Sequence, residues 1–540
     1  MNYLALLPFF IVALGGLLVL LLVRDPVRIG AARGAERQLV AAGDPAPARA
    51  ALGPAAAVAG PTEGSANHPV IVWTTLAILA AAIGTAIWQW LGDGSVAAGL
   101  SGGTIAFRQE FFHHLLAADW FSAFFTILVL VAGLVTVITL QPYAGQERMN
   151  HGELYALLLF AISGMVVLAS GIDLIVLFLG LEIMSLAVYA LVGMRRFDLL
   201  ANEGALKYVL LGAFSSAIFL FGVAFCYGAT GTTRLAGISA SAPGGAQHLY
   251  LLVGLMLLLA GLAFKVASFP FHMWAPDVYQ GAAAPITGFM ATAVKAASFA
   301  LFLRILFAGF SSLSVSWTGV LWWFAVLTMF VGNFTALRQT NIKRMLAYSS
   351  IAHTGYLLIG LAAAFGPHHG GVAAILYYLA AYALTNLGAF ACVAYLSGPG
   401  EQRITLDSWA GIGRRHPVIA TAMVVCMLSL IGFPPTAGFF GKYLLFSAAM
   451  RAGQTPLAFI GIFNSILSIW YYLRVVVVMT MRAPEGQPVA AQPRWGAGLA
   501  AGYAALAVVW AGIGPLTLIA IFPGAQSLVS WAHTAITTLF

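Results

Sequence analysis

The sequence predicts an all-α membrane protein with about fourteen transmembrane helices, in two inverted five-helix repeats with broken helices 7 and 12. Of the 540 residues, 61% are hydrophobic and only 8% are charged, whereas soluble domains carry about 25% charged residues. The apolar residues form runs of about 20, the length that a helix needs to cross a hydrocarbon core ~30 Å thick. Prolines interrupt two of these runs, and proline disrupts a helix interior.

Most connections between the fourteen runs are short, and one is long. Residues 24–69 are rich in Ala, Gly, Pro and Arg, which predicts a poorly ordered cytoplasmic loop. A short surface helix around Ala31–Ala42 is one possibility within it. The first run lacks the basic start of a signal peptide and is expected to remain as a helix. The predicted spans lie near residues 3–23, 70–91, 118–140, 153–170, 172–194, 203–228, 249–274, 283–309, 318–337, 343–364, 371–396, 417–450, 456–481 and 497–521.

Basic residues give the expected orientation. With the N-terminus outside, the inner connections hold sixteen Lys and Arg residues and the outer ones hold three, Arg108, Arg234 and Arg451. Cytoplasmic loops are enriched in Lys and Arg, so both termini are expected on the outer side. The net charge of +8 therefore reflects membrane topology and is not read as a sign of nucleic-acid binding.

Two runs are predicted to be broken helices. Pro417–Met450 would be about 51 Å long as one straight helix, and it contains the adjacent Pro434 and Pro435. The run Leu249–Trp274 is interrupted near Pro270. Each break holds a Phe-Pro pair, and the pairs lie five spans apart, so the two helices run in opposite directions, as in an inverted repeat. The predicted units are 1–23 for helix 1, 70–140 for helices 2 and 3, 153–309 for the first repeat, 318–481 for the second, and 497–521 for helix 14.

Five charged residues are expected deep within spans, where each charge costs roughly 2.5–3.5 kcal/mol on insertion scales. Burial disfavours the charged form of a lysine and a nearby carboxylate favours it, so a row of such groups bridged by water suits proton transfer. Structural explanations also exist. Lys207 lies near a span end and can snorkel to the surface, and Glu182 can simply neutralise a lysine. The candidates are Glu182, Lys207, Lys265, Lys295 and Lys442.

Histidines and cysteines are less informative. His353 and His272, the latter just past the first break, are candidate relay members. A hydrogen-bonded structural histidine is the alternative for each. The cysteines, Cys226, Cys392 and Cys426, lie inside apolar runs without metal-ligand spacing. They are expected to be small buried hydrophobes, and no metal site is predicted.

Five stretches make the chain resemble subunit N of respiratory complex I, the antiporter-like membrane subunit of the proton-pumping NADH–quinone oxidoreductase. The longest reads KVASFPFHMWAPDVYQGAAAP, and its DVYQGA portion resembles subunit N in particular. The wider Mrp-type antiporter family shares only the general layout. The resemblance covers about 70–540 and the first span. The stretches are Gly180–Ser185, Ala205–Tyr208, Lys265–Pro285, Lys343–Ser350 and Gly432–Lys442.

The resemblance implies a role for each deep charge. Glu182 and Lys207 would form a charge pair on helices 5 and 6. Lys265 would be the lysine of the broken helix 7, Lys295 the central connecting lysine on helix 8, and Lys442 the terminal lysine of the broken helix 12. Protons would pass along this chain, driven by redox chemistry in other subunits.

The resemblance also implies that this chain binds no cofactor and has no redox active site of its own. NADH, FMN, iron–sulfur clusters and quinone are expected in partner subunits. The expected partners are other membrane subunits of complex I, including neighbouring antiporter-like subunits, together with lipid, protons and water. The expected location is a bacterial inner membrane.

Two other classes of function compete with this one. The first is a stand-alone Mrp-type cation/proton antiporter. The Tyr-Gln-Gly-Ala stretch and the lack of a cluster of membrane carboxylates for a metal cation argue against it. The second is a structural membrane subunit with no ion path, against which the five deep charges argue.

Overall fold

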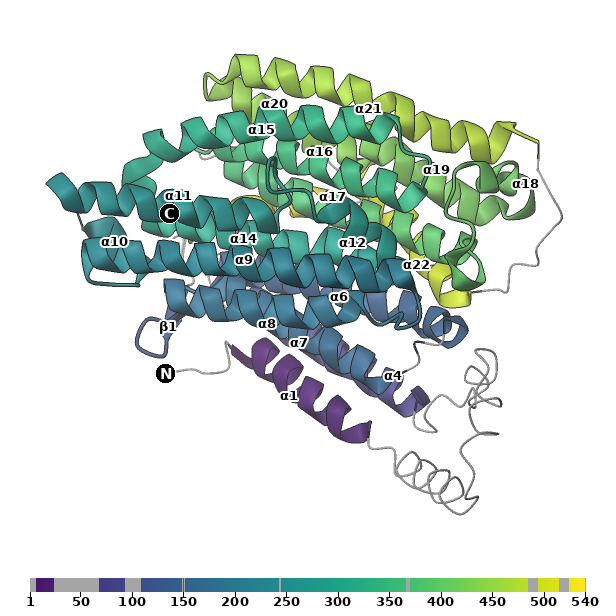
Figure 1. The fold of residues 1–540 in the computed structure, drawn as a ribbon, viewed down its shortest axis with the longest axis horizontal. Coiled ribbons are helices and arrows are strands. Elements are labelled where there is room, and N and C mark those ends of the chain that lie inside the picture. The colour runs from purple at the N-terminus through teal and green to yellow at the C-terminus, as the bar shows by residue number, and fades with distance from the viewer. Residues whose placement is uncertain are drawn as a thin grey trace, which may run out of the picture.

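The computed structural model is a bundle of helices that lie roughly side by side, with one short β-hairpin at one end (Figure 1). It describes residues 6–23, 68–92, 108–147, 149, 151–241, 244–365, 370–483, 494–513 and 524–539. The predicted loop at 24–69, with its short helix, lies outside these residues, except that residues 68 and 69 begin a helix.

Long helices make up most of the bundle. They are α1 (Leu7–Leu22), α4 (His68–Gly92), α6 (Trp120–Gln146), α7 (Gly152–Ser170), α8 (Leu174–Val192), α9 (Leu199–Thr230), α11 (Gly245–Lys265), α15 (Ser314–Leu337), α16 (Ile342–Ala362), α17 (Gly370–Leu396), α21 (Thr455–Met481) and α22 (Trp495–Ile513). The shorter elements are β1 (Arg108–Phe111), β2 (Leu116–Asp119), α10 (Leu235–Ala240), α12 (Ala275–Gly281), α13 (Ala284–Phe289), η2 (Met290–Val294), α14 (Lys295–Leu303), η3 (Arg304–Gly309), η4 (Ser311–Leu313), η6 (Pro399–Glu401), η7 (Asp407–Trp409), α18 (Ile412–Arg415), α19 (Pro417–Ile431), α20 (Ala437–Arg451) and α23 (Gly524–Ile536).

These helices confirm the predicted membrane fold. Within the described residues, twelve helices are long and apolar enough to cross a membrane. The other two predicted spans are α1, with 16 residues, and the broken pair α19 and α20. The fourteenth span was predicted to reach residue 521, but α22 ends at Ile513 and residues 514–521 lie outside the described ones. The helix α23 was not predicted.

Both described ends of the chain lie at one end of the bundle. The backbone N–H of Phe121, at the start of α6, donates to Thr538 Oγ1 at 3.3 Å. Near the N-terminus, Leu6 lines the same small cavity as Asp119. An even number of crossings brings the two ends of a chain to one side, which agrees with the fourteen predicted spans. This end, with β1 and β2, is called the hairpin end below, and the opposite end is called the Glu401 end.

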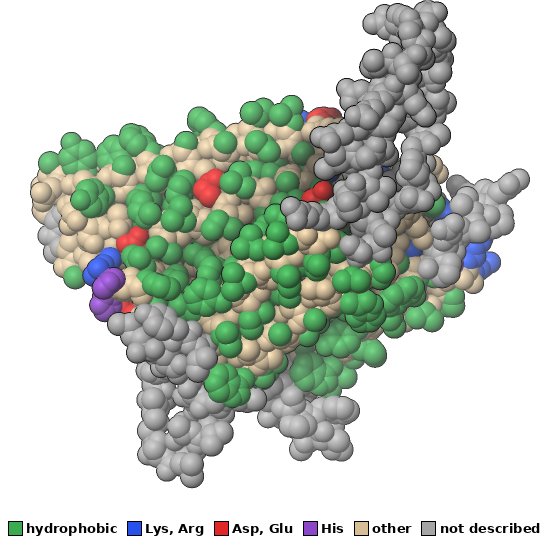
Figure 2. Space-filling view, turned by 90° about the horizontal axis from the view of Figure 1, so that it is seen from below, with side chains coloured by type: hydrophobic (Ala, Val, Ile, Leu, Met, Phe, Trp, Pro, Cys, Tyr) green, Lys and Arg blue, Asp and Glu red, His purple; other side chains and the backbone are tan. Residues whose placement is uncertain are grey.

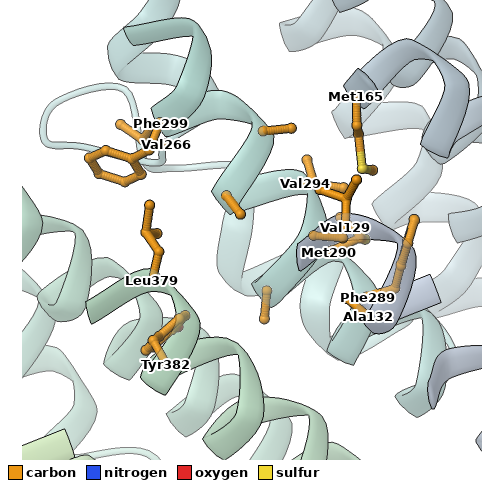
Figure 3. Packing of buried hydrophobic residues seen from close by; sticks show 14 of the residues in the cluster. Val129, Ala132, Met165, Val266, Phe289, Met290, Val294, Phe299, Leu379 and Tyr382 are labelled. Carbon is orange, nitrogen blue, oxygen red and sulfur yellow. The ribbon is translucent and has the colours of Figure 1, made fainter. Parts of the chain in front are cut away.

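One helix runs through the middle of the bundle. Its successive parts α13, η2, α14 and η3 form a span whose most apolar window is completely buried. Figure 3 shows this helix, with Phe289, Met290 and Val294, between α17 on one side and the residues Val129 and Met165 on the other. Two π-helical turns, η2 and η3, flank α14. Such turns occur frequently at functional sites.

Both predicted breaks are present. Helix α11 ends at Lys265, and residues 266–274 form turns before α12 begins. Helix α19 ends at Ile431 because Gly432 adopts a left-handed backbone conformation, with φ of 87°. This conformation suits glycine, which lacks a Cβ atom. Pro434 and Pro435 follow, and proline does not continue a helix.

A buried ion pair holds the hairpin end together. The two terminal nitrogens of Arg304 each donate to one carboxylate oxygen of Asp119 at 2.7 Å. Arg304 also donates to the carbonyl of Ala169, and Asp119 accepts from the backbone N–H of Ser122 at the start of α6. Both charged side chains are at most 1% exposed. A bidentate pair is geometrically specific, so it fixes the central helix against α6 and α7.

The outer surface of the bundle is largely apolar. Hydrophobic side chains cover much of the face in Figure 2, and few charged side chains interrupt them. Helix α9 alone exposes Leu210, Phe214 and Phe221 among other large side chains. Soluble monomers rarely expose contiguous apolar patches larger than a few hundred Å², so this surface fits a lipid environment. All three cysteines are buried and free, as expected.

Candidate functional site

The lysine at the first helix break is buried against α8. Lys265 is the last residue of α11 and is 4% exposed. Its Nζ donates to Ser185 Oγ at 2.8 Å and to Tyr189 Oη at 3.2 Å. Both partners are neutral hydroxyl groups, so among the described residues the ammonium has no direct counterion.

Glu182 lies on the same face of α8 as these two partners. Residues 182, 185 and 189 are three and four positions apart, and such positions are neighbours on a helix. Glu182 is half-buried, and its Oε1 is buried with no hydrogen-bond partner among the described residues. Its charge acts on the Lys265 ammonium and on the Tyr189 hydroxyl. Glu182 is therefore electrostatically coupled to Lys265.

Lys207 does not contact Glu182, which corrects the expected pairing. Its Nζ forms ion pairs with Glu203 Oε1 at 2.6 Å and Asp277 Oδ2 at 2.7 Å. Arg344 binds the other carboxylate oxygen of Asp277, also at 2.6 Å. The reason is that Glu203 lies one turn before Lys207 on α9, while packing brings α12 alongside. The Lys207 side chain is 42% exposed, so it lies at the edge of the bundle, unlike the buried Lys265.

We expect Lys207 to be coupled to Asp277 and independent of Glu182. In double-mutant cycles of thermal unfolding, combining Lys207→Met with Asp277→Asn should lower the Tm by less than the sum of the single changes. Combining Lys207→Met with Glu182→Gln should be additive within experimental error, since these side chains share no contact. A non-additive Glu182 cycle together with an additive Asp277 cycle would instead restore the pairing predicted from the sequence.

The lysine of the central helix has three hydrogen-bond acceptors. Lys295 begins α14, directly after the π-helical turn η2, and is 3% exposed. Its Nζ donates to the Ser350 carbonyl at 2.7 Å, to Ser350 Oγ at 2.6 Å and to Thr354 Oγ1 at 2.9 Å. An ammonium has three N–H donors. These contacts satisfy all of its donors, and none of them is with an anion.

The Thr354 hydroxyl connects the first helix break to Lys295. It accepts from Lys295 Nζ and donates to the carbonyl of Val266 at 2.7 Å. Val266 is the residue that follows Lys265, and the last carbonyls of a helix have no partner within it. One hydroxyl on α16 therefore bridges the environments of Lys265 and Lys295.

His353 lies on the same helix, between Lys295 and Lys442. It is 3% exposed, with Nδ1 2.5 Å from Tyr378 Oη and Nε2 3.0 Å from Tyr472 Oη. The charges that act on its ring are those of Lys442 and Lys295. His353 is thus the imidazole between two buried lysines, a position suited to the relay role predicted for it.

Lys442 is held by the second helix break. Its Nζ donates to the carbonyls of Leu430 and Ile431, at 2.9 and 2.8 Å, and to Ser465 Oγ at 2.8 Å. The Tyr356 ring centre lies 5.0 Å from Nζ, and Lys442 is 5% exposed. The C-terminal carbonyls of a helix lack helical partners and favour cations. The break after α19 therefore creates the site that Lys442 occupies.

The second predicted histidine lies apart from these contacts. His272 is half-buried, its Nδ1 is buried without a partner among the described residues, and its ring lies 5.6 Å from that of Phe269. The three predicted break residues, Pro270, Pro434 and Pro435, all lie in the turns between half-helices. Their positions explain why carbonyl groups are available beside the lysines.

Sequence reasoning did not identify an ion-pair cluster at the Glu401 end. Glu401, 1% exposed, accepts from Lys343 Nζ at 2.6 Å, Arg195 Nη1 at 3.1 Å and Tyr143 Oη at 2.6 Å. It also accepts from the backbone N–H of Ala284 at 2.8 Å. Ala284 is the first residue of the central helix, so this carboxylate anchors the helix that carries Lys295.

Lys343 fixes the turn before the central helix. Its Nζ donates to the carbonyls of Gln280 and Ala282 as well as to Glu401, and its side chain is 0% exposed. The sequence offered only a partial signal. Lys343 is one of the sixteen basic residues expected in the inner connections, while Glu401 follows a Gly-Pro-Gly turn where carboxylates are ordinarily solvated. Only the packing of the loop after α17 shows that both are buried.

Two carboxylates at this end titrate differently. Burial raises the pKa of Glu147, and the charge of Arg195 opposes that shift. Burial also acts to raise the pKa of Glu401, but Lys343 and Arg195 outweigh it and hold this pKa below its ordinary value. Glu147, whose Oε2 lies 3.8 Å from Arg195 Nη2, therefore accepts a proton more readily than Glu401.

The arrangement as a whole suits the movement of protons. None of the ion pairs among the described residues includes Lys265, Lys295 or Lys442. Hydroxyl groups, carbonyls and one imidazole lie between them, and water can bridge polar gaps of this kind. In the same part of the chain, no group of three or more His, Cys, Asp or Glu side chains is placed to hold a metal ion.

Comparisons with known proteins identify the family of the chain. Residues 170–468 match the family model described as the transmembrane part of NADH:quinone oxidoreductase and Mrp antiporters. The chain is 48% identical over 376 residues to NADH-quinone oxidoreductase subunit N of Trichlorobacter lovleyi, covering 69% of this chain and 77% of that relative.

Solved structures show the same similarity. A chain in respiratory complex I from Thermus thermophilus with bound aureothin is 36% identical, with a TM-score of 0.69 over 84% of this chain and 93% of that one. A chain of the Mrp complex from Dietzia sp. DQ12-45-1b is 21% identical, with a TM-score of 0.77 over 100% and 98% of the two chains. The second match shows a shared fold alone.

Proposed function

Because the chain belongs to the subunit N family of NADH–quinone oxidoreductase, we propose that it carries protons across the membrane through its buried lysines. The observation that supports this most is the row Lys265, Lys295 and Lys442, each at most 5% exposed. Each ammonium is hydrogen-bonded to hydroxyl or carbonyl oxygens, and to no carboxylate of the described residues. A buried amine without a counterion gives up its proton more readily than a paired one, which suits a group that must bind and release protons.

In this proposal the coupled Glu182 sets the charge state of Lys265. A change in the separation of this carboxylate and this amine changes how well the charged lysine is stabilised. Protons then pass by way of Thr354 and Lys295 to His353 and Lys442. Lys207 contributes a proton-binding amine at the edge of the bundle, where it contacts Asp277. His272 is proposed only as an additional proton acceptor beside the first break.

The energy for this movement comes from redox chemistry in other subunits. We propose that NADH, FMN, the iron–sulfur clusters and quinone are bound there and that this chain holds no redox active site. Its partners are neighbouring membrane subunits of complex I, including other antiporter-like ones. The two units of five helices, 153–309 and 318–481, are proposed as inverted repeats.

We also propose that the hairpin end faces the outer side of a bacterial inner membrane. The shared position of both chain ends supports this topology, since the basic residues gather in connections at the opposite end. Arg195 and Lys343 at the Glu401 end are two of these residues. Cytoplasmic loops carry the excess of Lys and Arg.

Reconstitution separates this function from a stand-alone antiporter. In liposomes, the complete oxidoreductase that contains this chain is expected to acidify one compartment when NADH and quinone are supplied. The purified chain alone is expected to show no exchange of Na⁺ or K⁺ for protons under an imposed gradient. Cation-dependent proton flux through the isolated chain would favour the Mrp-type alternative and contradict the proposal.

A further inference from the structure

Two buried polar atoms on α17 make no hydrogen bond of ordinary geometry among the described residues, although the Ser350 hydroxyl interacts with one of them, Tyr382 Oη. They are Tyr382 Oη and Asn386 Oδ1, on side chains that are 4% and 0% exposed. The amide nitrogen of Asn386 donates to the Tyr382 carbonyl at 3.1 Å, which orients the side chain. Buried polar side-chain atoms nearly always bind protein or ordered water. Asn386 Oδ1 therefore calls for a water molecule, and Tyr382 Oη can bind a second one beside the Ser350 hydroxyl.

Both side chains lie along the contact between α17 and the central helix. Tyr382, Asn386 and Phe390 are four positions apart and share one face of α17. The Tyr382 ring centre lies 5.5 Å from Lys295 Nζ. One end of this face is therefore at Lys295, and Figure 3 shows Tyr382 on α17 beside the central helix.

The other end of the same face reaches the start of the central helix. A Cβ atom at Gly288 would lie 2.9 Å from Phe390 Cβ, so this side chain packs directly on α13. Asn386, one turn from Tyr382 and one turn from Phe390, lies between these two contacts. Its unpaired oxygen is buried within the protein and away from the lipid-facing surface.

The contact between α17 and the central helix extends toward the Glu401 end of the bundle. The central helix begins at Ala284, whose N–H is bound by Glu401, and Lys295 lies about 16 Å further along at 1.5 Å per residue. Asn386 falls near the middle of that distance. Thr292, 2% exposed on the intervening turn, donates its hydroxyl to the Gly288 carbonyl, which leaves its oxygen free to accept from water.

We propose that Asn386 and Tyr382 hold ordered water between α17 and the central helix, and that this water supplies protons to Lys295 from the Glu401 end. The proposal rests on the proton-carrying function above and assigns a separate entry to its central lysine. In each transfer, the water beside the neutral amine breaks an O–H bond as an N–H bond forms on Lys295. The next water then donates a proton to replace the one lost, so no other reactant is consumed.

The test uses the complete oxidoreductase in liposomes. Asn386→Leu keeps a similar volume and removes the acceptor, and Tyr382→Phe removes the hydroxyl while keeping the ring beside Lys295. The matched control is Thr139→Val, because the buried Thr139 hydroxyl already donates to the Val135 carbonyl of its own helix. Both test variants are expected to assemble and to slow NADH-driven pumping by about three- to tenfold, a modest share of what positioned proton donors contribute.

Three further measurements distinguish proton supply from a structural effect. If proton delivery becomes limiting, both variants should show a larger solvent isotope effect in D₂O than the unmodified complex. Their rates should also begin to fall at a lower pH, because fewer protons are available at alkaline pH. In a cryo-EM map that resolves other buried water, density is expected beside Asn386 Oδ1.

Normal pumping in both variants would overturn the proposal. Slower pumping with an unchanged isotope effect and pH profile, or an empty site beside Asn386, would do the same. Lys295→Met separates this failure from failure of the proposed function. If Lys295→Met pumps normally, the proposed function itself is wrong. If Lys295→Met pumps slowly while Asn386→Leu and Tyr382→Phe pump normally, only the water path is rejected.

Discussion

Lys295→Met is expected to leave the oxidoreductase assembled and to reduce its NADH-driven proton pumping by at least about tenfold, equivalent to about 1.4 kcal/mol in the barrier. Methionine is also a long, unbranched side chain but has no ionisable amine. The Ser350 and Thr354 oxygens would lose the amine that they now bind. The path would then have no proton carrier between the two helix breaks. Quinone-linked NADH oxidation should fall with pumping wherever the two are tightly coupled.

In contrast to its pumping, the thermal stability of Lys295→Met should stay the same or increase. Replacing a buried ion pair by apolar side chains of similar size is often neutral or stabilising, while removing only one partner of such a pair is costly. The partners of Lys295 among the described residues are all neutral, so Met leaves no uncompensated charge among them. The measurements are the Tm of the purified complex and the response of a pH-sensitive dye in liposomes.

The control for Lys295→Met is Met290→Leu, a volume-conserving change on the same buried helix. Such changes usually cost less than about 1.5 kcal/mol, and no polar group is lost. Its pumping should therefore match that of the unmodified complex. Full pumping by an assembled Lys295→Met complex would rule out Lys295 as a carrier.

The second large effect is expected for Lys442→Met, again at least about tenfold in pumping. Lys442 is held by the free carbonyls of Leu430 and Ile431, and methionine does not bind them. Protons reaching His353 would then lack the amine that lies beyond it. The same dye assay and the same test of assembly measure the result.

Arg451→Met provides the matched control, since it removes a cation from the exposed end of the same helix α20. Exposed charges at helix ends contribute little to stability, and Arg451 lies outside the lysine row. Equal losses in the two variants would indicate a general effect of charge on α20. A normal Lys442→Met complex would place the path elsewhere.

The sequence by itself determined the class of fold and the positions of most spans. Composition and run length suffice for this because a helix that crosses a hydrocarbon core must be long and apolar. The breaks near Pro270 and Pro434 were also readable, since proline does not fit a helix interior wherever the helix lies. The buried lysines Lys265, Lys295 and Lys442 stood out because charge within an apolar run is costly.

Only the tertiary structure decided which groups meet. Lys207 stands next to Glu203 in the helix and meets Asp277 only because α12 packs against α9. The carboxylate of Glu401 is buried because a loop folds over the start of the central helix. Hydrogen bonds and ion pairs between distant segments depend on distances of a few tenths of an ångström. A linear pattern of hydrophobic and polar residues carries no such distances, so the partners of these side chains become visible only when the helices are packed.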